Sequence, residues 1–153
     1  MISAWDPGGT TGWAIWDDSG NLQNMGDCPL DKITETWQWL EATYGKITVV
    51  VIEDYRLFYK RAKKQAGSNM PASQGIGMLK AIAQLGNAEV VIQPPDRKTI
   101  GMRWAGMAKM PADHAKTHSL DAYVHGFYYM HGKGIVKSAL ELKKDRENGR
   151  TSS

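Results

Sequence analysis

Hydrophobic and polar residues alternate with a period of two near the start of the chain. Three short stretches show this pattern, at residues 2–6, 12–17 and 21–27. Gly-rich and Asp-rich connections separate them. This pattern predicts three strands joined by tight turns. Over residues 30–44 the apolar positions change to helical spacing, which predicts a helix that ends at Gly45.

The remainder of the chain is predicted to alternate between strands and helices. A continuous β-branched run over residues 47–53 is typical of a strand buried on both faces. Further elements are expected as a helix from Pro71 to Gly86, a strand at 88–92, a short helix or loop after Pro94-Pro95, and a final helix from about Pro111 to Met130. This order predicts an α/β fold with a mixed five-stranded sheet flanked by helices, whose first strand is central.

The predicted first and fourth strands both end in an acid. Asp6 is followed by Pro7 and a glycine-rich turn, so the first strand must stop there and leave the carboxylate at its tip. Glu53 closes the β-branched run in the same way. Because neighbouring parallel strands end at the same edge of a sheet, where ligands bind in open α/β folds, we expect the two acids to lie side by side.

The last predicted helix carries a stripe of polar side chains that can face this edge. His114, His118, Asp121 and His125 are separated by four, three and four residues. In isolation such a spacing is more often a solvated surface pair than a ligand set. We therefore select His118 and Asp121 only in combination with the strand-end acids, and interpret His114 and His125 as edge residues or phosphate contacts. Asp113 is interpreted as a helix cap.

Charge is distributed unevenly along the 153 residues. Residues 1–54 carry nine acids and two bases, whereas residues 55–153 carry seven acids and seventeen bases, so the formal net charge of +3 conceals balances of −7 and +10. The basic later part of the chain, which also contains aromatic residues, should attract the phosphate backbone of a nucleic acid. The acidic earlier part would repel that backbone unless cations lie between the acids and the phosphates. Nucleic acid together with a metal is the expected partner. The candidate DNA-binding residues are Arg56, Lys60, Arg61, Lys63, Lys64, Arg97, Lys98 and Arg103.

Length and composition favour one domain with a hydrophobic core. We assign residues 1–136 to it and interpret residues 137–153 as a charged tail that is partly disordered. The single cysteine, Cys28, cannot form an internal disulfide, and no apolar run approaches the ~20 residues that cross a bilayer. We expect a soluble protein of a reducing cytoplasm, with no membrane partner.

Three segments resemble a known family. Asp6-Pro7-Gly8, the run Val49–Glu53 and the segment His118-Ser119-Leu120-Asp121-Ala122 are similar, in order and spacing over roughly residues 1–131, to the RuvC-type Holliday-junction resolvases, and the chain looks most like their phage-encoded branch. The resemblance implies a ribonuclease-H-like fold, a host cytoplasm if the protein is viral, and Asp6, Glu53, His118 and Asp121 as both catalytic residues and ligands of two Mg²⁺ or Mn²⁺ ions. Many bacterial members have Asp where this chain has His118.

The function expected from the sequence is a metal-dependent, structure-selective endodeoxyribonuclease that cuts Holliday junctions, or other branched DNA such as flaps or forks. A homodimer would match a two-fold junction, and Met78 or Leu79 is a candidate for its interface. Three alternatives remain open. Residues 6–10 also resemble the phosphate loop of actin-like sugar kinases, the chain could bind branched DNA without cutting it, and a related nuclease could act on RNA hybrids.

Overall fold

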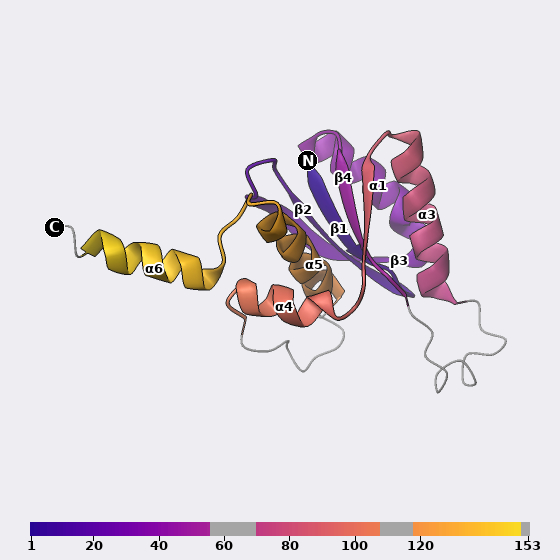
Figure 1. The fold of residues 1–153 in the computed structure, drawn as a ribbon. Coiled ribbons are helices and arrows are strands. Elements are labelled where there is room, and N and C mark those ends of the chain that lie inside the picture. Colours follow the sequence, from indigo (N-terminus) through magenta and orange to yellow (C-terminus); the bar gives the residue numbers. More distant parts are fainter. Residues whose placement is uncertain (56–69, 108–117, 151–153) are drawn as a thin grey trace, which may run out of the picture.

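The computed structural model describes residues 1–55, 70–107 and 118–150, in which one mixed sheet runs through the centre of the molecule (Figure 1). The strand order is β3-β2-β1-β4-β5, and β1 pairs antiparallel with β2 and parallel with β4. The first strand is therefore central, as the alternation pattern predicted. The strands are β1 (Ile2–Asp6), β2 (Thr10–Trp16), β3 (Leu22–Pro29), β4 (Val49–Glu53) and β5 (Glu89–Gln93).

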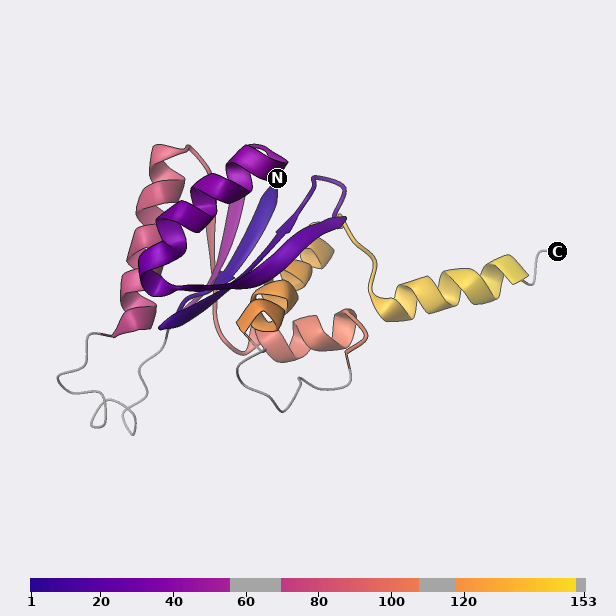
Figure 2. The same cartoon turned by 180° about the vertical axis from the view of Figure 1, so that it is seen from behind.

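Helices cover both faces of the sheet (Figures 1 and 2). One face is covered by α1 (Ile33–Tyr44), which follows a single 3-10 turn η1 (Leu30–Lys32), and by α3 (Pro71–Leu85). The other face is covered by α5 (His118–Gly132), against which α4 (Arg97–Trp104) packs. The fold is α/β, with the helices distributed as the sequence pattern predicted. No helix in the described ranges is both long enough and apolar enough to span a bilayer.

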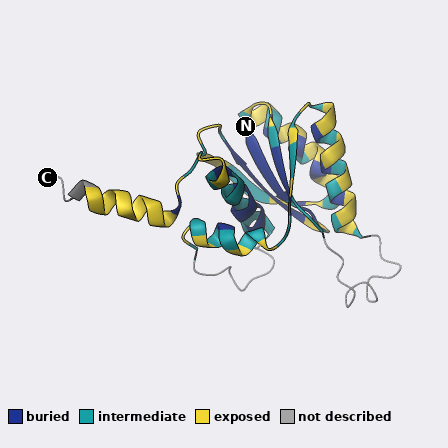
Figure 3. Ribbon diagram, viewed as in Figure 1, coloured by how far each residue is buried: buried dark blue, intermediate teal, exposed yellow. Residues whose placement is uncertain are grey.

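Two hydrophobic cores lie on opposite sides of the sheet, and Figure 3 shows the central strands between them as buried. Beneath α1 and α3 the indole rings of Trp5 and Trp37 stack, with centroids 6.2 Å apart. Beneath α5 the core is built around Trp16 and Met130, both almost fully buried. Successive side chains of a strand point to opposite faces, so the alternation along β1 supplies both cores at once.

Two glycines allow α5 to rest directly on the sheet. A Cβ atom at Gly12 of β2 would fall within about 2 Å of the main-chain oxygen of His118. Farther along the helix, a Cβ atom at Gly126 would lie 2.3 Å from Cη2 of Trp16. A side chain at either position would push the helix away, so these contacts fix how close the first turns of α5 come to the ends of the strands.

The C-terminal residues contain a helix that the sequence analysis did not assign. Ala139–Arg150 form α6, which stands away from the body of the protein (Figure 1), and the partial disorder expected for the tail stays a prediction. A capping box begins the helix, because the amide of Glu141 donates to Oγ of Ser138 and the amide of Ser138 donates to the Glu141 carboxylate. The motif Ser138-x-x-Glu141 was the sequence signal for this helix. A domain boundary at residue 136 stays a prediction.

One interface candidate is wrong. Leu79 is fully buried in the core beneath α3, and Met78 packs partly buried against the same core. Both residues belong to the apolar side of α3, which faces the sheet.

Candidate active site

The acids predicted at the strand ends lie side by side. Trp5 pairs with Ile52 in the parallel register of β1 and β4, so the next residues along, Asp6 and Glu53, reach the same edge of the sheet. The turn after Asp6 is closed by Thr11, whose hydroxyl donates to the carbonyl of Gly8 at 3.1 Å. The first turns of α5 bring His118 and Asp121 to this edge, so the structure gathers the four predicted site residues there.

Asp6 is bound by His118 from across the site. The carboxylate oxygen Oδ2 of Asp6 lies 2.9 Å from Nδ1 of His118, and the aspartate side chain is only 16% exposed. Burial, followed by the negative charge of Glu53, raises the pKa of Asp6 to about 7, against a smaller opposing effect of the His118 hydrogen bond. Near neutral pH this carboxylate therefore holds a proton readily, or needs a cation beside it.

Glu53 is approached by a residue that sequence reasoning left outside the site. His125 lies four residues after Asp121 on α5 and is fully buried, with Nε2 3.3 Å from Oε2 of Glu53. Burial alone would raise the pKa of Glu53, but the polar contact and charge of His125, with smaller contributions from Asp6 and Lys98, lower it below the usual range. The other ring nitrogen, Nδ1, lies 2.8 Å from Oε1 of Gln93. The four-residue spacing was the signal that could have placed His125 here.

Asp121 forms an ion pair with Lys98 of α4. The ammonium group of Lys98 thus lies inside the cluster of acids, and the predicted contact of Lys98 with DNA stays a prediction. Burial raises the pKa of Asp121, and Lys98 opposes that rise. The second carboxylate oxygen, Oδ1, has no hydrogen-bond partner among the residues that the structure describes. A buried carboxylate oxygen left in this state is costly unless a donor or cation meets it.

Among the described residues, no three His, Cys, Asp or Glu side chains converge closely enough to form a ready-made ion site. Each acid instead has a nitrogen partner, namely His118 for Asp6, His125 for Glu53 and Lys98 for Asp121. Three clustered carboxylates and an imidazole are nevertheless the hard oxygen and nitrogen donors that Mg²⁺ and Mn²⁺ accept. The unpartnered Oδ1 of Asp121 also fits a cation. The residues therefore fit such a group, which would compete with the Lys98 ammonium for Asp121.

The other basic candidates are placed only in part. Arg97 sits above the ring of Tyr128, 5.7 Å from its centroid, and lines a pocket of about 400 Å³ that also touches Gln93. Arg103 is exposed on the far end of α4. Several predicted residues lie outside the described residues: Arg56, Lys60, Arg61, Lys63, Lys64, Asp113 and His114.

Comparison with solved structures identifies the fold. The chain is similar to T. thermophilus RuvC in complex with a Holliday junction substrate, with a TM-score of 0.63 and 13% identity over 90% of this chain and 98% of that one. It is also similar to fowlpox virus resolvase in complex with substrate Holliday junction DNA (TM-score 0.53, 17% identity, 86% and 99% covered). The fowlpox virus Holliday junction resolvase alone gives a TM-score of 0.50 at 16% identity, covering 86% and 97%.

No protein-family model matches the sequence, and none of the curated proteins does. At these identities the likeness establishes the fold. The chain has the ribonuclease-H-like fold of RuvC and the poxvirus resolvases, as the sequence resemblance predicted.

Proposed function

We propose that this chain, which has the fold of the RuvC-type resolvases, is a metal-dependent endonuclease that cuts Holliday junctions or similarly branched DNA. The observation that carries the proposal is the convergence of Asp6, Glu53 and Asp121 at one sheet edge, drawn from β1, β4 and α5. A core with no catalytic role has no need of three acids in one half-buried cluster, because each charge is costly to bury beside the others.

Asp6, Glu53, His118 and Asp121 are the residues that would hold Mg²⁺ or Mn²⁺, in two ions if the site follows the two-metal pattern. Bound ions of this kind activate a water for attack on the phosphodiester and stabilise the leaving oxygen. Asp6 supports the assignment because burial and the neighbouring charge of Glu53 raise its pKa, and a bound cation would offset both effects. A cation would compete with the Lys98 ammonium for Asp121, whose other oxygen, Oδ1, has no hydrogen-bond partner among the described residues. A Lys98 ammonium displaced in this way would be available to a DNA phosphate, the contact that the sequence predicted for it.

Branched DNA is proposed as the substrate because the structural neighbours are resolvases bound to Holliday junctions. A homodimer is proposed because two strands of a four-way junction must be cut, and a two-fold protein matches a two-fold substrate. The burial of Leu79 removes one of the surface residues considered for its interface.

The test is cleavage of one set of labelled oligonucleotides annealed as a four-way junction, a flap, a plain duplex and an RNA–DNA hybrid. Each is incubated with Mg²⁺, with Mn²⁺ or with chelator, and Asp6→Asn protein purified in parallel controls for contaminating nuclease. We expect metal-dependent nicks near the branch point of the junction. Preferential cleavage of the hybrid would assign the protein to another ribonuclease-H-like activity, and binding without cleavage would make it a junction-binding protein. A rise in melting temperature with ATP would favour the kinase interpretation.

A further inference from the structure

His125 is a fully buried imidazole that the sequence analysis interpreted as an edge residue or phosphate contact, and to which the family resemblance assigns no role. Its ring is fully buried between α5 and the ends of β4 and β5. Gln93, the last residue of β5, is itself 5% exposed and stands opposite Glu53 in the parallel register of β4 and β5. The His125 ring, which α5 carries, therefore contacts the last residue of β4, Glu53, and the last residue of β5, Gln93.

The two ring nitrogens have different surroundings. Nδ1 is 2.8 Å from Oε1 of Gln93, and a half-turn of that amide would put its nitrogen there instead, as a donor to the lone pair of Nδ1 in a neutral ring protonated at Nε2. Nε2 makes no well-formed hydrogen bond within the described residues, and the acceptor in reach is the carboxylate of Glu53 at 3.3 Å. A bare lone pair on Nε2 would face the lone pairs of that carboxylate. The arrangement is favourable only if Nε2 carries a hydrogen directed at Glu53.

We propose that His125 is a positioning residue for Glu53: it donates from Nε2 to the carboxylate and so holds it toward Asp6, while Gln93 fixes the orientation of the imidazole ring. The inference rests on the proposed function for its catalytic meaning, because it explains how a ligand of that site is held. Outer residues that orient a ligating carboxylate in this way typically change metal affinity or activity by about 10- to 100-fold when they are replaced.

The helix backbone supports this role. Gly126 follows His125 directly, and its Cα packs so closely that an added Cβ would overlap the Trp16 ring and approach Cβ of Ala4 at 3.1 Å. The turn of α5 that carries His125 is therefore held at a fixed distance from β1 and β2. A ring anchored on that turn, and bound at its other nitrogen by Gln93, has little freedom to follow a moving carboxylate, so the carboxylate adopts the position that the ring allows.

The placement of the hydrogen is tested without DNA or metal. Long-range ¹H–¹⁵N spectra of the histidine side chains report which ring nitrogen carries a hydrogen, and loss of one signal in His125→Gln assigns the ring. We expect Nε2 of His125 to be protonated and its signal to move in Glu53→Gln. An unprotonated Nε2, or a signal indifferent to Glu53→Gln, would overturn the proposal, whatever the protein does to DNA.

The positioning role is tested by a double-mutant cycle on Mn²⁺ affinity, measured by calorimetry in His125→Leu, Glu53→Gln and the double variant. If His125 acts through Glu53, we expect His125→Leu to weaken binding by about 10-fold or more in the parent and to have no further effect beside Glu53→Gln. Losses that multiply in the double variant would mean that the two residues act independently, which would overturn the proposal.

His125→Gln separates positioning from a general packing role. A glutamine amide can donate from nearly the same point as Nε2, whereas leucine fills the space without a donor. We expect His125→Gln to recover most of the Mn²⁺ affinity and, on a four-way junction, most of kcat, even where both variants melt at the same lowered temperature. If affinity and kcat follow the melting temperature in both variants, His125 is only a core residue. If the parent binds Mn²⁺ and cuts no DNA, the proposed function fails while the cycle and the spectra still decide the role of His125.

Discussion

Asp6 and His118 are 112 residues apart in the chain, yet Oδ2 of the aspartate lies 2.9 Å from Nδ1 of the histidine. The contact joins the end of the central strand to the first turn of α5, and it brings an imidazole to a carboxylate whose pKa is already raised by burial and by Glu53. The geometry of this pair underlies the first two predictions.

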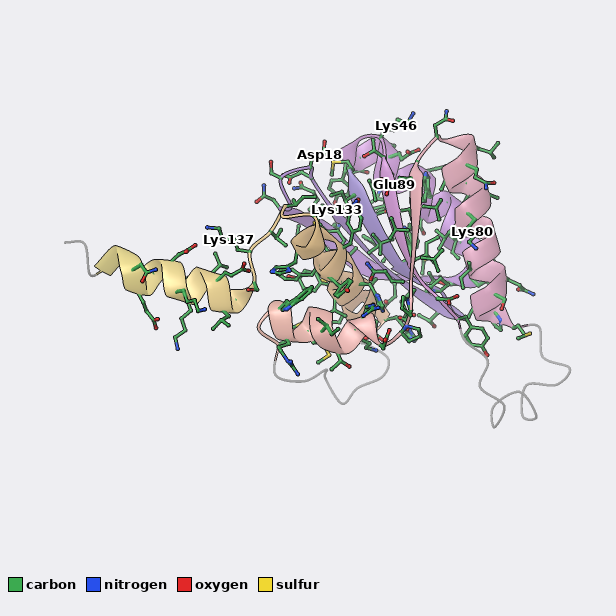
Figure 4. The ribbon with its side chains drawn as sticks, viewed as in Figure 1. Asp18, Lys46, Lys80, Glu89, Lys133 and Lys137 are labelled. Carbon is green, nitrogen blue, oxygen red and sulfur yellow. The ribbon has the colours of Figure 1, made fainter. Side chains whose placement is uncertain are left out.

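Replacing any one acid by its amide should abolish cleavage and leave junction binding intact. Asp6→Asn, Glu53→Gln and Asp121→Asn each remove a charge from the cluster while preserving its shape, so DNA affinity should stay the same or rise as repulsion of the phosphate backbone falls. Cleavage rates and gel-shift affinities measure the two effects. Asp18→Asn is the matched control, because this exposed acid lies in the turn at the other end of the sheet (Figure 4). If Asp6→Asn cuts like the parent, the assignment of the site is wrong.

The metal-free protein should become less stable as pH rises from about 4 to 7. The folded state holds the Asp6 proton up to a pKa of about 7, whereas the unfolded chain releases it near 3.8, so folding takes up a proton in this window. The free energy of unfolding should fall by at most about 1.4 kcal/mol per pH unit from this group.

Thermal melting in the presence of chelator, at intervals across that pH window, measures the effect. Asp6→Asn cannot titrate at this position and should show a flatter dependence on pH than the parent. Identical pH profiles in the two proteins would mean that Asp6 has an ordinary pKa.

Arg97 and Arg103 of α4 should contribute phosphate contacts. Alanine at each should weaken junction binding and lower the slope of log affinity against log salt by roughly 0.9 per lost contact. Lys46→Ala and Lys80→Ala are matched controls, since these exposed lysines lie after α1 and on α3, away from the site edge (Figure 4). Slopes that fall equally in all four variants would indicate a diffuse electrostatic effect with no defined DNA-binding face.

His118 should set the metal preference. An imidazole is a softer ligand than a carboxylate, so the parent should cut at least as well with Mn²⁺ as with Mg²⁺. His118→Asp should raise the ratio of the Mg²⁺ rate to the Mn²⁺ rate, and His118→Ala should weaken cleavage with both ions. Both cleavage rates are measured at saturating metal, so that the ratio of the Mg²⁺ rate to the Mn²⁺ rate does not depend on how tightly each ion binds. Normal cleavage by His118→Ala with either ion would remove His118 from the ligand set.

Close packing of α5 on the sheet should make Gly126 intolerant of any side chain. Gly126→Ala forces a methyl group into the Trp16 ring, and overpacking of this kind costs about 1–3 kcal/mol of stability. Gly77 on the exposed side of α3 has open space around its added Cβ, so Gly77→Ala should stabilise the protein by about 0.5–1 kcal/mol through helix propensity. Urea denaturation of the two variants tests the contrast, and equal effects would contradict the packing described for α5.

The sequence allowed prediction of the parts of the site that depend on backbone pattern. A β-branched run that ends in Glu53, parallel to a strand that ends in Asp6, is enough to bring those acids together. The partners of the acids were not predictable, because they depend on the rotation of α5 and α4 about their axes and on side-chain rotamers. His125 was therefore interpreted as an edge residue or phosphate contact, and the ion pair between Lys98 and Asp121 was not anticipated. The capping box at Ser138 is visible in the sequence, but the expectation for the tail considered only its density of charge.

The division of the hydrophobic interior by the sheet has a consequence for how the protein tolerates change. Of the two cores, the one beneath α1 and α3 contains none of the proposed ligands, whereas the one beneath α5 supports the helix that carries two of them. Substitutions in the first core that lie away from Trp5 and Ile52, the neighbours of Asp6 and Glu53, should therefore change mainly the free energy of unfolding. Substitutions in the second core can also move α5, and with it two residues of the proposed site.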